Sequence, residues 1–176
     1  MHLLRGTGKT TSPYFDKLRS GPLGNVFSLG DEVEVNAASA SAEDLAKFDT
    51  LTQLWGAQDL SISEPEVVAL QETLDLLKET YGIMSSGNER IDRASAALSW
   101  PIRVPDLYIE MVGRKQPEAL ILLAHYSLLL NLAKDFWWLQ GMSRQLLQTT
   151  YKSLPEYLRD SISWPLQDLI MSEFRN

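Results

Sequence analysis

His125 and Tyr126 are the side chains best suited to proton-transfer chemistry in this 176-residue chain. A histidine serves as a general base when a second group orients its ring. No Asp or Glu stands one helical turn before or after His125. The favoured interpretation is therefore a histidine satisfied within the core. A cofactor-free isomerase or cyclase that uses His125 and Tyr126 for proton transfer is the alternative.

Metal and nucleotide sites are not predicted by the remaining motifs. The chain has two histidines and no cysteine, so His2 and His125 cannot form a two-histidine metal site on one helix. Gly8, Lys9 and Thr10 resemble the end of a phosphate-binding loop. The first glycine of that loop would fall at Leu3, however, and no strand pattern precedes it. We expect no catalytic residue, no metal and no cofactor.

A cluster of aromatic residues follows the most apolar stretch of the chain. Phe136, Trp137 and Trp138 are consecutive, and they could stack on a planar ligand or fill space in a core. Packing is the favoured interpretation, because large aromatic side chains in helices are most often part of a core. Lining of a ligand pocket is the alternative.

These residues must be positioned by the helix that precedes them, in the stretch PEALILLAHYSLLLNLAKDFWWLQG from Pro117 to Gly141. The segment from Ala119 to Ala133 is apolar on nearly all sides, and such a helix must be surrounded by other helices. A membrane-spanning helix needs about 20 apolar residues, so this segment is too short and too polar to span. The pattern predicts an all-α, single-domain helical bundle around a central apolar helix, with no membrane span.

Composition limits the partners that the chain can bind. The chain has the composition of an ordinary globular protein, with 44% hydrophobic and 22% charged residues. The net charge is -7, which gives no basic field to attract phosphates. We therefore expect no direct nucleic-acid binding by this chain. The lack of cysteine excludes disulfide bonds and catalysis by a thiolate. Because no hydrophobic signal segment is visible either, we expect an intracellular protein.

Turn and capping signals divide the chain into two parts. Residues 1–40 are rich in Gly, Ser, Thr and Pro, and they predict a short helix and a flexible loop. Residues 41–176 predict the helical domain. Ser63 and Glu66 form a capping box around Pro65, which predicts a helix start there.

Two further helix boundaries follow from proline and glycine. A helix is predicted from Glu89 to Leu98, because the residue before Pro101 is pushed out of the helical region. Another is predicted from Phe136 to Ser153 with Gly141 inside it, where the glycine would permit close helix contact. Lys134 and Asp135 before it allow either a continuation of the central helix or a kink.

Five short motifs, in order, resemble the C-terminal effector region of fungal binuclear zinc-cluster transcription factors, with the sterol uptake control group as the nearest match. They are Leu3-Leu4-Arg5-Gly6, Gly21-Pro22-Leu23, Trp100-Pro101 before Val104 to Tyr108, Ala119 to Tyr126 with Trp137-Trp138-Leu139-Gln140-Gly141, and Trp164-Pro165. Their order and rough spacing agree over most of the chain.

The resemblance implies a helical regulatory domain without enzymatic activity, found in the nucleus, the cytoplasm or both. In sterol-responsive members, such a domain holds a sterol in an apolar pocket. The six cysteines of the zinc cluster are absent here. A homodimer or a protein of the transcription machinery is the expected protein partner, and a structural module that binds a partner protein is a further alternative.

The implied ligand is a sterol-like hydrophobic molecule between the Tyr108 to Met111 segment, the central helix and the Phe136 to Met142 segment. Pockets of this kind are mostly apolar, with a few polar groups that fix orientation. Tyr126 or His125 would bind the hydroxyl of the ligand. Trp137 and Trp138 point about 100° apart on a helix, so at most one of them would face the centre of the pocket. The expected ligand-binding residues are Tyr108, Met111, His125, Tyr126, Leu129, Trp137, Trp138 and Met142.

Overall fold

The computed structural model describes residues 42–56, 62–86, 92–137, 139 and 141–174. The chain divides into two compact units, Met1–Glu34 and Val35–Asn176. All described residues belong to the second unit. The short helix and loop predicted for residues 1–40 lie outside the described residues.

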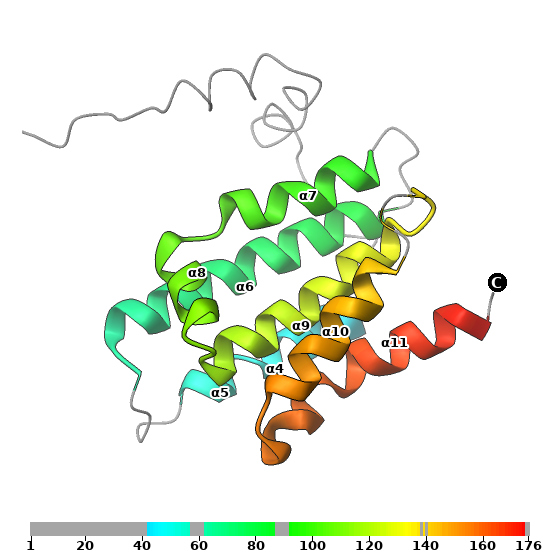
Figure 1. Cartoon of the computed structure of the whole chain (residues 1–176). Helices are drawn as coiled ribbons and strands as arrows, with labels where there is room; N and C mark the ends of the chain where they lie inside the picture. The colour runs from blue at the N-terminus through cyan, green and yellow to red at the C-terminus, as the bar shows by residue number, and fades with distance from the viewer. Residues whose placement is uncertain (1–41, 57–61, 87–91, 138, 140, 175–176) are drawn as a thin grey trace, which may run out of the picture. The chain divides into compact units, whose positions relative to one another are not determined.

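The described part of the chain is helical and contains no strand, which confirms the all-α prediction (Figure 1). Its elements are α4 (Ala42–Thr50), α5 (Gln53–Gly56), α6 (Glu64–Ser85), α7 (Arg93–Arg103), α8 (Asp106–Gly113), α9 (Pro117–Leu132), α10 (Met142–Ser153), the 3-10 helix η1 (Glu156–Ile162) and α11 (Ser163–Phe174). None of the described helices is both long and apolar enough to cross a membrane.

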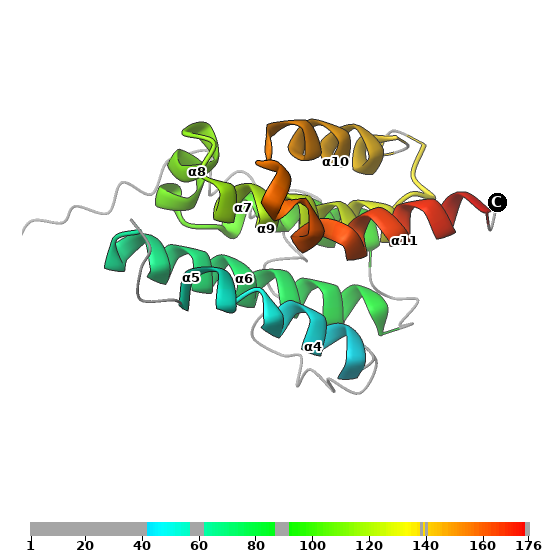
Figure 2. The same cartoon turned by 90° about the horizontal axis from the view of Figure 1, so that it is seen from below.

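Helix α9 begins at Pro117, a residue whose fixed φ and missing N–H suit the first helical position. Eleven of its 16 residues are buried. It packs against α6, α7, α8, α10, α11 and η1, and in Figure 2 α6 and α10 lie on opposite sides of it. Because α9 has almost no polar face, each of these helices presents its apolar side to it.

The start of α6 is fixed by the predicted pair Ser63 and Glu66. The Glu66 carboxylate accepts hydrogen bonds from the Ser63 backbone N–H at 2.9 Å and from its hydroxyl at 2.8 Å. Its other oxygen accepts from Arg114 and Gln116, each at 3.1 Å. The Ser63 backbone and hydroxyl, followed by Gln116, lower the pKa of Glu66 to about 2. One carboxylate thus joins the start of α6 to the turn between α8 and α9.

The prediction that a helix ends before Trp100 is wrong. Helix α7 begins at Arg93, where the Asp92 side chain accepts from the backbone N–H groups of the first turn, and continues through Pro101 to Arg103. A proline inside a helix leaves the carbonyl four residues earlier without its backbone donor. Here that carbonyl belongs to Ala97, and the Tyr126 hydroxyl donates to it at 3.1 Å. A side chain of α9 therefore replaces the bond that Pro101 removes.

The prediction of a helix from Phe136 to Ser153 is also wrong at its start. Helix α9 ends at Leu132, residues 133–137 form turns, and α10 begins at Met142. Gly141 is the residue before α10, with φ of 81°. This left-handed conformation strains other residue types but not glycine. The chain reverses here so that α10 packs back against α9, and Gly141 serves the turn rather than a helix contact.

Truncation of a side chain on α9 should show how closely it is packed. Leu129 is 0% exposed, so Leu129→Ala should lower the free energy of unfolding by about 2 to 5 kcal/mol, as expected for a buried cavity. Val68→Ala, at a side chain 51% exposed, should change it by less than about 0.5 kcal/mol. Urea unfolding measures both, and a small effect at Leu129 would contradict the packing.

A double-mutant cycle should test the bond between Tyr126 and Ala97. Tyr126→Phe leaves the buried Ala97 carbonyl without a donor and should cost about 1 to 3 kcal/mol of stability. Pro101→Ala restores a backbone N–H that can bind that carbonyl, so Tyr126→Phe should cost much less in this background. Equal costs in both backgrounds, measured by urea unfolding, would show that the hydroxyl does not compensate for the proline.

Candidate functional site

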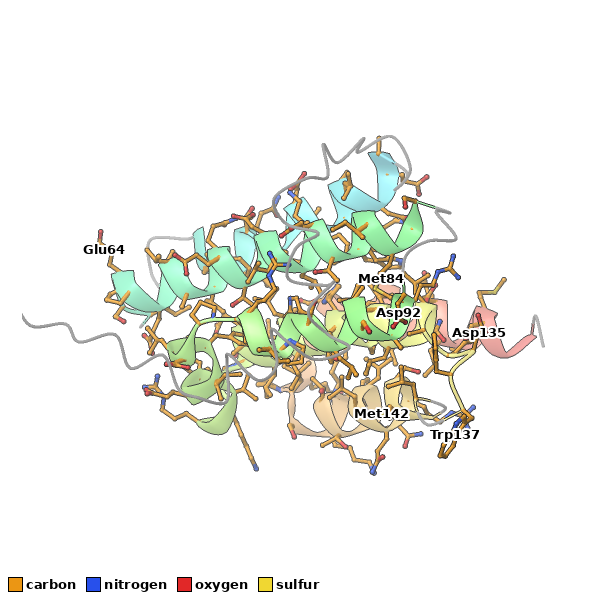
Figure 3. All side chains as sticks on the ribbon, turned by 90° about the horizontal axis from the view of Figure 1, so that it is seen from above. Glu64, Met84, Asp92, Asp135, Trp137 and Met142 are labelled. Atoms are coloured by element: carbon orange, nitrogen blue, oxygen red, sulfur yellow. The ribbon has the colours of Figure 1, made fainter. Side chains whose placement is uncertain are left out.

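The predicted ligand-binding residues separate into an inner set and an outer set. Tyr108, Met111, His125, Tyr126 and Leu129 are all buried. Trp137 is 81% exposed and Met142 is 41% exposed, and Figure 3 shows Trp137 pointing outward from the turn before α10. Trp138 lies outside the described residues. The structure therefore brings the inner set into the core and leaves Trp137 and Met142 on the surface.

Tyr108 of the inner set and Trp137 of the outer set lie near opposite ends of α9. The Tyr108 hydroxyl donates to the Ala119 carbonyl, in the first turn of α9, at 3.2 Å, whereas Trp137 follows the last turn. The helical rise places Ala119 and Leu132 about 20 Å apart. A sterol-like ligand bound beside Tyr108 would therefore not contact Trp137.

His125 and Tyr126 are neighbours on α9, and consecutive helical side chains point about 100° apart. The structure accordingly places them in different aromatic clusters. Tyr126 joins Trp100 and Tyr108, which we call the tyrosine cluster. His125 joins Phe48, Tyr81 and Trp164, which we call the histidine cluster.

The tyrosine cluster combines side chains from α7, α8 and α9. The Trp100 and Tyr126 rings stack with centroids 4.6 Å apart and planes 15° apart. Tyr108 meets Trp100 edge-on at 5.9 Å. Both tyrosine hydroxyls donate to backbone carbonyls, and burial raises the pKa of Tyr126 to about 12. Neither phenol is therefore available as a proton acceptor near neutral pH.

Trp100 carries the polar atom of this cluster that lacks a partner. Its side chain is 1% exposed, and its Nε1 is buried with no hydrogen-bond acceptor among the described residues. A buried N–H without an acceptor costs about 1 to 3 kcal/mol, so this donor is suited to an oxygen supplied by another molecule. The sequence offered only a weak signal for it, namely an indole directly before a proline.

The histidine cluster packs His125 among rings rather than charges. His125 lies 6.1 Å from Phe48 and 5.9 Å from Trp164, centroid to centroid. Its Nδ1 lies 2.8 Å from the Ile121 carbonyl, which makes Nδ1 the protonated nitrogen. Desolvation lowers the pKa of His125 to about 4, against a smaller raising effect of the Ile121 carbonyl. His125 is therefore neutral at physiological pH.

Polar side chains border the histidine cluster where α9 meets α11. The Asn131 amide donates to Asp168 at 2.7 Å, and the Ser172 hydroxyl donates to Asn131 at 3.2 Å. Lys134 donates to the Ser172 carbonyl at 3.4 Å. These bonds tie the turn after α9 to α11. None of them orients His125.

The arrangement favours binding over proton transfer. His125 and Tyr126 face different clusters, and each is bonded to a backbone carbonyl. Among the described residues, no group of three or more His, Asp or Glu side chains is placed to hold a metal ion. The features suited to a ligand are the aromatic tyrosine cluster and its unused buried donor, Trp100 Nε1.

Comparison with known proteins gives one informative similarity. Over 89 residues, the chain is 29% identical to a protein from Gibberella zeae described as a Zn(2)-C6 fungal-type transcription factor. The aligned part covers 51% of this chain and 18% of that protein. No family model and no solved structure matches the chain. Part of the chain is thus a distant homologue of a zinc-cluster transcription factor, and placement in the sterol uptake control group is not supported.

Acidification should test the burial of His125. Its pKa is lower in the folded than in the unfolded chain, so its stabilising effect is complete above pH 6.5 and is lost as the pH falls towards 4. The expected loss is about 2 kcal/mol between pH 7 and pH 5. Urea unfolding should show this dependence in the wild type and not in His125→Gln. An equal dependence in both proteins would contradict the burial of a neutral ring.

Proposed function

We propose that this chain is a regulatory domain of a zinc-cluster transcription factor and that it binds a hydrophobic, sterol-like ligand in the nucleus or cytoplasm. The similarity to the transcription factor of Gibberella zeae is the observation that carries the regulatory role. The all-α architecture agrees with it, and the absence of cysteine means that this chain supplies no zinc cluster of its own.

The tyrosine cluster is the proposed place for the ligand. Trp100 Nε1 is a buried donor that lacks an acceptor among the described residues, and a sterol offers one hydroxyl oxygen. Of the residues predicted from the sequence, Tyr108 and Tyr126 belong to this cluster, and the buried residues Met111 and Leu129 are kept in the proposal. His125, Trp137 and Met142 do not, because they lie in the other cluster or on the surface.

Ligand binding at this place requires a change of structure. Tyr108, Met111 and Trp100 are each at most 1% exposed, so a ligand enters only when α7 or α8 moves away from α9. Helix α8 is eight residues long, and the Tyr108 hydroxyl is one of its bonds to α9. A ligand that binds the opened form shifts the population towards it. Occupancy is thereby coupled to the conformation of the domain.

A second candidate function is the binding of a partner protein. Trp137 is 81% exposed, and Phe136 and Met142 beside it are 36% and 41% exposed. Tryptophan is enriched among residues that contribute most to protein interfaces. This aromatic turn favours docking to another protein, such as a component of the transcription machinery.

Titration with a fluorescent sterol should distinguish the two functions. We expect saturable binding, and Trp100→Phe should weaken it more than about tenfold, or 1.4 kcal/mol, because the indole N–H is lost while the stacked ring remains. Trp137→Ala is the matched control and should leave affinity unchanged. No binding by the folded wild type would leave partner binding as the better account, and equal affinity of Trp100→Phe would refute the proposed place.

A further inference from the structure

Helix α10 has an outer side that carries positive charge and no negative charge. Arg144, Gln148 and Lys152 are all exposed, and residues four apart lie on the same side of a helix. The helix contains no Asp or Glu, although the chain as a whole has a net charge of -7. Figure 2 shows α10 at the edge of the described bundle, across α9 from α6. Its cations therefore face outward, away from the helical core.

The 3-10 helix η1 adds a further cation beside the end of α10. The guanidinium carbon of Arg159 lies 4.7 Å from the centre of the Tyr151 ring. Glu156 is three residues before Arg159, and a 3-10 helix places such residues on one side. No ion pair among the described residues includes Arg159. Stacking thus directs the guanidinium towards α10 instead of towards the carboxylate on its own helix.

Arg159 has hydrogen-bonding capacity that the described residues do not use. Its Nε is buried without an acceptor among them, and the terminal nitrogens form the edge that a carboxylate from outside can reach. A guanidinium stacked on an aromatic face keeps its planar N–H groups in position for such a carboxylate. Because Tyr151 already holds the side chain, less conformational freedom is lost on binding.

The basic face is defined by Arg144, Tyr151, Lys152 and Arg159. We propose that the basic face binds an acidic segment of a partner protein. Charge complementarity selects the acidic occupant, and Tyr151 and Tyr157, 38% and 80% exposed, add aromatic contact area. The proposal rests on the partner-binding function described above and requires no sterol.

The spacing of the cations indicates which acidic segments fit. Arg144 and Lys152 are eight residues apart, which is about 12 Å along the helix. An extended chain covers this distance in about four residues. Two carboxylates about four residues apart therefore reach both ends of the basic face, and an apolar residue between them can contact Tyr151.

A short acidic peptide suits the basic face better than a nucleic acid does. At physiological salt, exposed charges more than about 8 Å apart are largely screened, so the local cations determine what binds. Duplex DNA carries one negative charge about every 1.7 Å and would extend beyond the basic face onto a chain with a net charge of -7. An acidic peptide can place its charges only where the cations lie.

Fluorescence anisotropy with a labelled 12-residue peptide tests the proposal. The peptide carries Asp and Glu four residues apart with Leu and Phe between them, and its control has Asn and Gln in place of the acids. We expect saturable binding of the acidic peptide that weakens as salt is raised, and no binding of the control. Arg159→Gln and Tyr151→Ala should each weaken binding at least about fivefold, whereas Tyr151→Phe keeps the stacked ring and should retain it.

Two further variants separate the basic face from other charges. Arg103→Gln removes an exposed arginine of α7 that pairs with Glu79, and it should leave the affinity unchanged. Glu156→Gln should strengthen binding, because it removes a carboxylate that competes for Arg159. Equal affinity of Arg159→Gln and the wild type would overturn the proposal.

The aromatic turn supplies the variant that separates this inference from the partner-binding function. If Trp137→Ala weakens peptide binding and Arg159→Gln does not, partner binding stands and the basic face is refuted. No binding by the folded wild type, or tighter binding of a short DNA duplex, would also overturn the proposal without affecting the sterol titration.

Discussion

Helix α9 has almost no side that can face water, and the rest of the described fold depends on covering it. Its buried residues run from Ala119 to Leu130 without a polar stripe. The helices that pack against it come from both earlier and later parts of the chain. The polar groups that α9 does carry must then be satisfied inside, since a buried polar atom without a partner is costly. His125 and Tyr126 meet this demand through backbone carbonyls.

Features set by local sequence were predictable, whereas those set by distant partners were not. The start of α6 at Ser63 and Glu66 and the start of α9 at Pro117 follow from capping and proline rules that act within one turn. Where α7 passes through Pro101, the Ala97 carbonyl accepts its hydrogen bond from Tyr126, which is far along the chain. The turn at Gly141 depends on the return of α10 to α9. No pattern within either segment reports such a contact.

The same reasoning explains what could be predicted of the candidate site. Of the residues predicted to bind a ligand, Tyr108, Met111, His125, Tyr126 and Leu129 are buried. The sequence pattern did not predict that His125 and Tyr126 join different clusters. The two side chains point in different directions from α9, and what each one contacts depends on which helices cover that side. The sequence pattern also could not find the missing acceptor of Trp100 Nε1, which is a property of the assembled core. Trp137 is exposed because the chain turns there instead of continuing as a helix.

A regulatory domain must change the output of a promoter to which it is brought. The most direct measurement fuses residues 1–176 to an unrelated DNA-binding domain and follows a reporter gene in fungal cells that are replete with or depleted of sterol. The account predicts that sterol alters reporter output and that Trp100→Phe abolishes this response while Trp137→Ala retains it. Output equal to that of the DNA-binding domain alone, under both conditions, would contradict it.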